Sequence, residues 1–189
     1  MFEIFFIIMA YLVGAIPTGF WLVKYVKGID VREIGSGNIG ATNVTRALGK
    51  KWGAITLLID LGKSFCVIWI GKKLYFSDPV IALGVGALLL GNAFSCFLKG
   101  QGGKGVATML GIYLALSPLV FCVGALTYGL FRKLSGISAV GSLAAACVLP
   151  IASTFFLPSF YVFLSLGISL FVMIRHRKNI AELYQKFCK

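Results

Sequence analysis

A glycine-rich polar segment between two apolar stretches holds the first residues that could bind an anion. It spans residues 35–46 and reads GSGNIGATNVTR. Glycine permits positive φ angles and close backbone approach, so consecutive N–H groups in such a turn can surround an anion. Ser36 adds a hydroxyl, and Arg46 adds a fixed charge with fork-like donors. The other candidate binding residues are Gly35, Gly37, Asn38, Gly40, Thr42 and Asn43.

A second glycine-rich segment, residues 99–108, lies directly before another apolar stretch and reads KGQGGKGVAT. A flexible backbone, a lysine and the N-terminus of a helix together favour phosphate binding. Its candidate residues are Gly102, Gly103, Lys104 and Gly105. Both segments match G-x-G-x-x-G, but neither follows a strand of a βαβ unit, and Lys104 is followed by Gly105 rather than Ser or Thr. Dinucleotide and Walker A sites are therefore not favoured.

A third polar segment, RHRKNI at residues 175–180, follows the last apolar stretch. Basic residues commonly flank membrane helices simply to orient them, so this pattern alone favours topology over chemistry. The segment contains His176, the one histidine of the chain. The five cysteines form no CxxC pair and no metal spacing with it, so we expect unpaired cysteines and no metal site.

The composition indicates that lipid is the solvent for most of the chain. Hydrophobic residues make up 59% and charged residues 13%, with a mean hydropathy of +0.93. A soluble domain would carry about 25% charged residues. The net charge of +12 indicates cytoplasmic loops, anionic lipid or anionic substrates. It does not favour nucleic acid, because no soluble domain is left to present a basic face.

The apolar stretches predict an all-α polytopic membrane protein with one domain, residues 1–189. They lie at about 2–23, 53–70, 79–98, 106–131, 136–156 and 158–174. A span needs about 20 residues, so six helices are the simple count. Ser117-Pro118 near the middle of the fourth stretch allows seven, since proline breaks helices.

The basic clusters decide between the two counts. With seven segments, the N-terminus lies outside, the C-terminus is cytoplasmic, and every basic cluster except Lys72/Lys73 falls inside. We therefore predict seven transmembrane helices, with six as the alternative. Within the second stretch, Asp60 and Lys63 share a helix face at i, i+3 and are predicted to pair.

The three polar segments together resemble the bacterial glycerol-3-phosphate acyltransferases that use acyl phosphate as donor, the PlsY family. GSGNIGATNVTRALGKKWG is similar to the first motif of that family, KGQGGKGVAT to its second and HRKNI to its third. The resemblance covers almost the whole chain. It implies a seven-helix membrane fold with the active site at the cytoplasmic face.

The resemblance also implies roles for individual residues. Ser36 and Arg46 would be essential in the first motif. Gly102, Gly103, Lys104 and Gly105 would belong to the glycerol 3-phosphate site. His176 and Asn179 would be the active pair of the third motif, and Ser138 would add a hydrogen bond to the phosphate region. The catalytic set expected on this basis is Ser36, Arg46, Lys104, His176 and Asn179.

The activity implied is acyl transfer from a long-chain acyl phosphate to glycerol 3-phosphate, giving 1-acylglycerol 3-phosphate (lysophosphatidic acid) and phosphate. This would be the first step of phospholipid synthesis, without cofactor, in the bacterial cytoplasmic membrane. The partners implied are the two substrates, membrane lipids and an enzyme that supplies acyl phosphate.

The residues themselves constrain the mechanism. The three segments contain no carboxylate, and one histidine supplies no Ser–His–Asp series. We therefore predict direct attack of the glycerol hydroxyl on the acyl carbon, with a substrate phosphate accepting the proton. A general-base His176 and a structural His176 remain alternatives. The same loops would also suit a transporter of phosphorylated metabolites, which would leave glycerol 3-phosphate unchanged.

Overall fold

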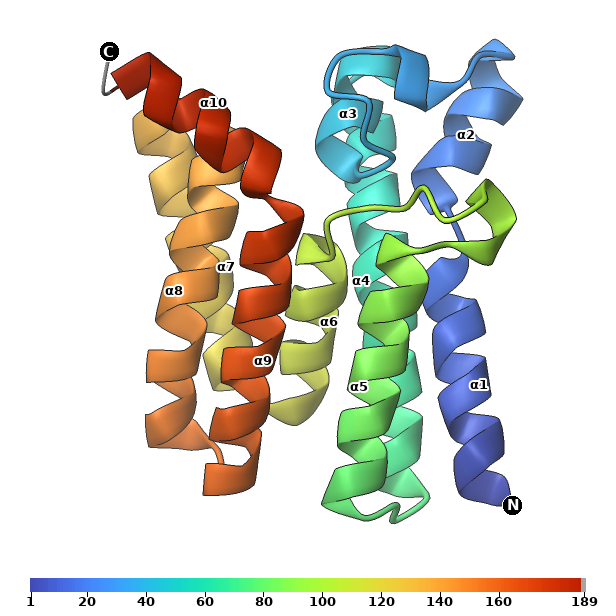
Figure 1. The fold of residues 1–189 in the computed structure, drawn as a ribbon, viewed down its shortest axis with the longest axis vertical. Helices are drawn as coiled ribbons and strands as arrows, with labels where there is room; N and C mark the ends of the chain where they lie inside the picture. Colours follow the sequence, from blue (N-terminus) through green and yellow to red (C-terminus); the bar gives the residue numbers. More distant parts are fainter. Residues whose placement is uncertain (188–189) are drawn as a thin grey trace. The chain divides into compact units, whose positions relative to one another are not determined.

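A computed structural model of the chain describes residues 1–187, and within them the chain is helical, with no strand (Figure 1). Cys188 and Lys189, which end the predicted C-terminal basic cluster, lie outside the described residues. The chain divides into two compact units, Met1–Leu116 and Ser117–Lys189. The first unit contains α1 (Phe2–Ala15), α2 (Thr18–Lys27), η1 (Val31–Glu33), α3 (Ala41–Leu48), α4 (Lys50–Lys73), α5 (Asp78–Ala93), η2 (Cys96–Leu98) and α6 (Val106–Leu116). The second contains α7 (Pro118–Ser135), α8 (Ser138–Phe156), α9 (Ser159–Arg175) and α10 (Arg177–Phe187).

The all-α prediction is confirmed for the described residues, and several segments could cross a bilayer. Four are long and apolar enough: Phe2–Lys27, Lys50–Lys73, Asp78–Leu98 and Ser138–Phe156. A fifth results if α9 and α10, which meet at a bend of 63°, count as one span. The predicted break in the fourth apolar stretch is present, because α6 ends at Leu116 and α7 begins at Pro118. The count of seven spans remains a prediction.

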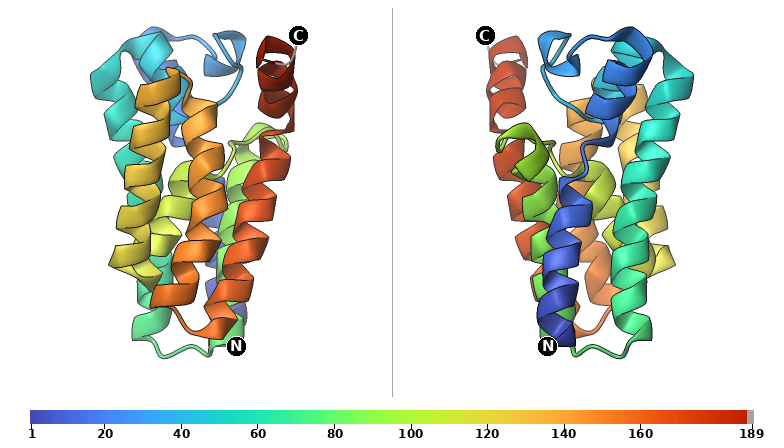
Figure 2. Two further views of the ribbon diagram at one scale, coloured as in Figure 1. Left: turned by 90° about the vertical axis from the view of Figure 1, so that its left-hand side faces the viewer. Right: turned by 90° about the vertical axis from the view of Figure 1, so that its right-hand side faces the viewer.

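The first unit is built on two tight helix pairs, α1 with α5 and α4 with α6 (Figures 1 and 2). Small residues allow both contacts. A Cβ on Gly14 of α1 would overlap the carbonyl of Leu88, and one on Gly91 of α5 would overlap the carbonyl of Tyr11. A Cβ on Gly111 of α6 would likewise overlap the carbonyl of Leu61. Backbones that approach this closely gain dispersion contacts, which drive helix association in lipid.

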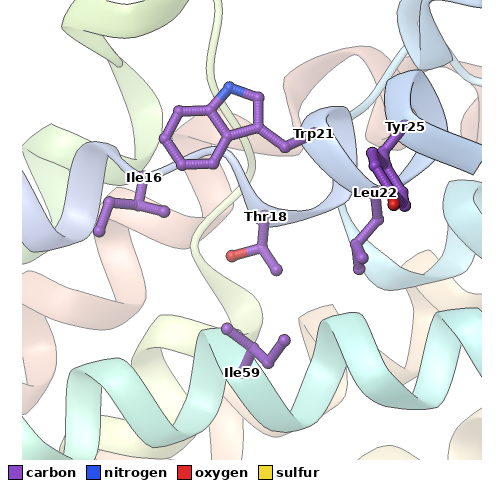
Figure 3. A pocket seen from close by; sticks show the side chains of 6 residues that line it. All are labelled: Ile16, Thr18, Trp21, Leu22, Tyr25 and Ile59. Carbon is purple, nitrogen blue, oxygen red and sulfur yellow. The ribbon is translucent and has the colours of Figure 1, made fainter. Parts of the chain in front are cut away.

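The sequence predicts one helix for the first apolar stretch, but the structure has two, α1 and α2. The stretch breaks at Ile16-Pro17, where proline has no N–H to continue the helical bonding. The carbonyl of Ile16 at the break accepts from the N–H of Thr18 at 3.1 Å and from Nζ of Lys63 of α4 at 2.7 Å. A hollow of about 430 Å³ lies beside the break and is lined by Ile16, Thr18, Trp21, Leu22, Tyr25 and Ile59 (Figure 3).

The predicted Asp60–Lys63 pair is confirmed. Lys63 Nζ lies 2.8 Å from Asp60 Oδ1. Thr18 of α2 donates its hydroxyl hydrogen to the same carboxylate oxygen at 2.8 Å. Asp60 and Thr18 are buried. Two opposite charges and a hydroxyl therefore satisfy one another and tie both sides of the α1–α2 break to α4.

Lys72 and Lys73, which did not fit the predicted distribution of basic residues, have local partners. Lys72 Nζ donates to the carbonyl of Ala115 at 3.3 Å, at the C-terminus of α6, where a helix favours a cation. Lys73 Nζ lies 5.5 Å from the ring centroid of Trp69. The four described cysteines, Cys66, Cys96, Cys122 and Cys147, are unpaired, and they are exposed rather than buried.

Candidate active site

Asn43 shapes the first glycine-rich loop. Its side chain is buried at the start of α3, where its Nδ2 donates to the carbonyls of Val31 and Ile34 at 2.8 and 2.9 Å. Its Oδ1 accepts the N–H of Ser36 at 3.1 Å. Because the amide uses both donors and its acceptor within the loop, Asn43 positions the loop rather than contacting a ligand.

Gly35, Ser36 and Arg46 lie together on the exposed side of this loop. Gly35 has φ +54°, and a Cβ there would lie 2.6 Å from Asn43 Oδ1 and 3.4 Å from Arg46 Nη1. Only glycine tolerates both this backbone angle and this approach. Ser36 and Arg46 are exposed, Arg46 from the last turn of α3. The Ser36 hydroxyl is therefore exposed on this loop, and the Arg46 guanidinium lies beside the adjacent Gly35.

The rest of the loop contains Gly37, Asn38 and Gly40, and Thr42 follows in the first turn of α3. Gly37 has φ +67°, whereas Gly40 has φ −78° and caps the N-terminus of α3. A Cβ on Gly40 would meet nothing closer than Asn38 Nδ2 at 3.7 Å. Gly40 is therefore the glycine of this loop with the most room, while Gly35 has the least.

The second glycine-rich loop is bound to the end of α5 by its own amides. The N–H of Gly102 donates to the carbonyl of Ala93 at 3.1 Å, and the N–H of Gly103 to that of Asn92 at 2.8 Å. A Cβ on Gly102 would overlap the carbonyl of Asn92. These two glycines therefore allow the loop to lie against α5, and their amides hold it there.

The N-terminus of α6 follows this loop immediately. Its first helical bond runs from the N–H of Met109 to the carbonyl of Gly105, so the preceding amides of the turn face the loop end. Lys104 is half-buried beside this end. The combination of a helix N-terminus and a lysine suits an anionic group.

A direct contact joins the two loops. Arg32, in η1 just before the first loop, donates from Nη1 to Oε1 of Gln101 at 2.8 Å. Asp30 holds the same guanidinium, with Nε at 3.0 Å and Nη2 at 2.6 Å from its carboxylate oxygens. These hydrogen bonds from the Arg32 side chain lower the pKa of Asp30 below its usual 3.8, and partial burial opposes the shift.

The remaining predicted site residues belong to the second unit. His176, at the end of α9, has Nδ1 2.8 Å from the carbonyl of Val172. Because a carbonyl can only accept, Nδ1 carries the hydrogen of this bond. Asn179, in α10, donates to Glu182 at 3.2 Å. Ser138 at the start of α8 shares a 2.9 Å hydrogen bond with Tyr128, which also accepts from Arg132 at 3.0 Å.

Neither the contact between Arg32 and Gln101 nor the Tyr128–Arg132 pair is predicted from the sequence. Tyr128 and Arg132 are spaced i, i+4 on one helix, which is a detectable signal. Arg32 and Gln101 are 69 residues apart, and no spacing rule relates them.

Comparison with known proteins shows the family of the chain. The sequence model of the family described as glycerol-3-phosphate acyltransferase matches residues 4–186. The glycerol-3-phosphate acyltransferase of Fusobacterium nucleatum is 42% identical over 181 residues, which cover 94% of this chain and 92% of that protein. That of Geobacter sulfurreducens is 42% identical over 184 residues, covering 96% and 93% of the two chains.

Two solved structures share the fold. The crystal structure of PlsY, an integral membrane glycerol 3-phosphate acyltransferase, in its glycerol 3-phosphate form has a TM-score of 0.93 at 35% identity, covering 98% of this chain and 94% of the other. Its lysophosphatidic acid form has a TM-score of 0.90 at 34% identity, with coverages of 98% and 93%. The match of the family model over nearly the whole chain and the relatives at 42% identity lead to one conclusion: the chain is an acyltransferase and belongs to the glycerol-3-phosphate acyltransferase family.

Proposed function

We propose that this protein transfers a fatty acyl group from a long-chain acyl phosphate to glycerol 3-phosphate, giving 1-acylglycerol 3-phosphate and phosphate. The observation that carries the proposal is that Ser36 and Arg46 are both exposed at the first glycine-rich loop, which Asn43 fixes. A guanidinium and hydroxyl on a rigid loop suit the phosphate of an activated donor. The solved relatives with glycerol 3-phosphate and lysophosphatidic acid support the acceptor and the product.

The chemical step proposed is direct. The primary hydroxyl oxygen of glycerol 3-phosphate bonds to the acyl carbon, and the bond from that carbon to the phosphate oxygen breaks. The hydroxyl proton passes to a phosphate oxygen, so phosphate leaves with it. Acyl phosphate is already activated. The larger task is to hold two anions together, which repel by about 1 kcal/mol at about 4 Å in water and several-fold more at lower effective dielectric.

The residue roles follow from this task. Arg46 and Ser36 hold the donor, while Lys104 and the N-terminus of α6, after Gly102, Gly103 and Gly105, hold the acceptor phosphate. Ser138, His176 and Asn179 act on the same substrates. Orientation of both reactants supplies about 7–11 kcal/mol of barrier reduction in well-aligned reactions. Nε2 of His176 is the alternative proton acceptor, because Nδ1 already donates to Val172.

The cellular setting is part of the proposal. The chain would cross the bacterial cytoplasmic membrane seven times as a single functional domain, with its active site at the cytoplasmic face. An enzyme that makes acyl phosphate would supply the donor, and the product would begin phospholipid synthesis. The basic clusters around the first loop and in the tail support this orientation.

Purified protein in detergent with palmitoyl phosphate and glycerol 3-phosphate tests the proposal. Lysophosphatidic acid and phosphate should form in equal amounts, as measured by mass spectrometry and phosphate release. The same protein in sealed vesicles should not accumulate labelled glycerol 3-phosphate. Uptake of unchanged glycerol 3-phosphate without product would favour the transporter alternative and sink the proposal.

A further inference from the structure

We propose that Arg32 and Gln101 form a bridge that sets the position of the second glycine-rich loop for the acceptor phosphate. Neither residue would contact a substrate, so both are positioning residues. The bridge is the 2.8 Å hydrogen bond from Arg32 Nη1 to Gln101 Oε1. This inference rests on the proposed function, because it assigns the second loop to glycerol 3-phosphate.

Arg32 is fixed before it reaches Gln101. Asp30 accepts from its Nε, from its Nη2 and from its backbone N–H, the last at 2.9 Å. The guanidinium carbon also lies 5.2 Å from the ring centroid of Phe20. Asp30 uses one edge of the guanidinium and Phe20 lies against its face, so the Nη1 group is directed at Gln101. A side chain held this way loses little rotamer freedom in forming one more bond.

The first loop is rigidly connected to Arg32. Asn43 binds the carbonyl of Val31, next to Arg32, and the N–H of Ser36 with the same side chain. A Cβ on Gly37 would lie 3.3 Å from the carbonyl of Arg32. The guanidinium therefore belongs to the same fixed segment as Ser36.

Gln101 lies at the part of the second loop that α5 holds least directly. The amides of Gly102 and Gly103 bind α5, whereas the N–H of Gln101 donates to the carbonyl of Leu98 within the loop. Lys99 and Gly100, just before it, have φ +52° and +81°. The Gln101 side chain is thus a tether from this strained turn to the first loop, and Lys104 follows three residues later.

The ion pair of Arg32 with Asp30 favours a role for Arg32 in positioning the loop over a role in binding the substrate phosphate. Arg32 already forms an ion pair with Asp30, with Nη2 2.6 Å from Oδ2. The Asp30 carboxylate and the neutral Gln101 amide take three of the five side-chain N–H donors of Arg32. A phosphate could reach only the other two and would compete with the Asp30 carboxylate for the charge. Loss of the bridge should therefore loosen the second loop without removing a charge from the substrates.

Kinetics of four variants test the bridge. Gln101→Met keeps the side-chain length but removes the acceptor, and Arg32→Lys keeps the charge beside Asp30 but removes Nη1. Each should raise KM for glycerol 3-phosphate about 3–10-fold, as expected for the loss of one hydrogen bond of typical net strength. The kcat and the KM for palmitoyl phosphate should stay within about 2-fold of wild type, because neither residue touches the reacting atoms. The double variant should be no worse than the more affected single variant, since the two lose the same bond.

Gln185→Met, at the other glutamine of the chain, is the matched control and should change nothing. Three results would overturn the bridge: an unchanged KM in Gln101→Met, equal increases for both substrates, or effects that multiply in the double variant. The wild-type enzyme in the same assay separates this test from the proposed function. If wild type makes no lysophosphatidic acid, the proposed function fails. If the wild-type enzyme makes lysophosphatidic acid but the variants do not raise KM for glycerol 3-phosphate more than KM for palmitoyl phosphate, only the bridge proposal fails.

Discussion

The polar residues of the first loop have different structural roles, although they form one cluster in the sequence. Asn43 is buried and fully hydrogen-bonded within the loop, whereas Ser36 and Arg46 are exposed beside it. The sequence analysis placed Asn43 among the substrate-binding residues. Composition could not separate these roles, because asparagine serves equally as a turn residue and as a ligand.

Substitution should separate the two kinds of residue. Ser36→Ala and Arg46→Ala should each lower kcat by about 10²-fold or more, as loss of a preorganised donor does, with an unchanged melting temperature. Asn43→Ala should instead lower the melting temperature, because a buried side chain loses its three hydrogen bonds. Steady-state kinetics measures kcat of each variant, and thermal unfolding in detergent measures its melting temperature. Near-normal turnover of Ser36→Ala would remove its assigned role, and an acyl group trapped on Ser36 would contradict direct attack.

Gly102 and Gly103 should respond differently to alanine. A Cβ on Gly102 would overlap a backbone carbonyl, so Gly102→Ala should yield little folded protein. A Cβ on Gly103 would lie 3.0 Å from Asn92 Oδ1, a side-chain atom that can move. Gly103→Ala should therefore fold and raise KM for glycerol 3-phosphate about 5-fold, with a smaller change in kcat. A folded Gly102→Ala with normal kinetics would show that the loop does not need this close contact.

The Asp30–Arg32 pair predicts a dependence of stability on pH. The pKa of Asp30 is lower in the folded protein than in the unfolded chain. The pair therefore stabilises the folded state fully at pH values above the usual pKa of 3.8, and this stabilisation is lost as the pH falls through the folded pKa. Asp30→Asn should lower the melting temperature by a constant amount above about pH 5, and the difference should shrink towards pH 3. Melting curves of both proteins across this range check the sign. A difference that grows on acidification would mean that Asp30 is not stabilised in its charged form.

At the scale of elements, the long helices were predictable and the short ones were not. The bounds of four apolar stretches agree with those of four helices to within about three residues, except at the C-terminal end of α5. These helices are α4, α5, α8 and α9. The break at Pro17 is hard to predict, because a single proline stands in a long and mostly apolar stretch. Helix α3 is also hard to predict, since its Thr and Asn residues favour turns, although Gly40 and Gly49 mark its ends.

The α1–α2 break makes Lys63 a sensitive position. Lys63→Met leaves the Asp60 carboxylate buried beside Thr18 without its cation, at a cost of about 3–5 kcal/mol for a broken buried pair. The melting temperature in detergent should fall by several degrees. Adding Asp60→Leu to Lys63→Met should recover part of the loss, because no unpaired charge is then buried. A double variant less stable than Lys63→Met would show that Asp60 is stabilised by other partners.

At the scale of the whole molecule, the family motifs are divided between the two units. The first two lie within Met1–Leu116 and the third lies within Ser117–Lys189. The sequence was sufficient to find all three, because each is locally polar within an apolar chain. It could not give the Arg32–Gln101 contact or the α5 anchor of Gly102, since both depend on which helix ends meet in space.

The predicted orientation can be tested with single cysteines in a cysteine-free background. Ser77, between α4 and α5, is exposed and predicted to lie outside, whereas Lys51 at the start of α4 is exposed and predicted inside. In intact cells a membrane-impermeant maleimide should label Ser77→Cys and not Lys51→Cys. Lys186→Cys, near the end of α10, should also stay unlabelled if the chain crosses seven times. External labelling of Lys186→Cys together with Ser77→Cys would favour six spans.

The break at Ile16-Pro17 also has a consequence for how the protein is made. The carbonyl of Ile16 accepts one local hydrogen bond, from the N–H of Thr18 at 3.1 Å, and a second one from Lys63, 47 residues later in the chain. Synthesis at about 5–20 residues per second separates Ile16 from Lys63 by roughly 2–9 seconds. During that interval the second hydrogen bond of this carbonyl must come from water or lipid headgroups. The first span is therefore complete only after α4 has been synthesised and has docked against it.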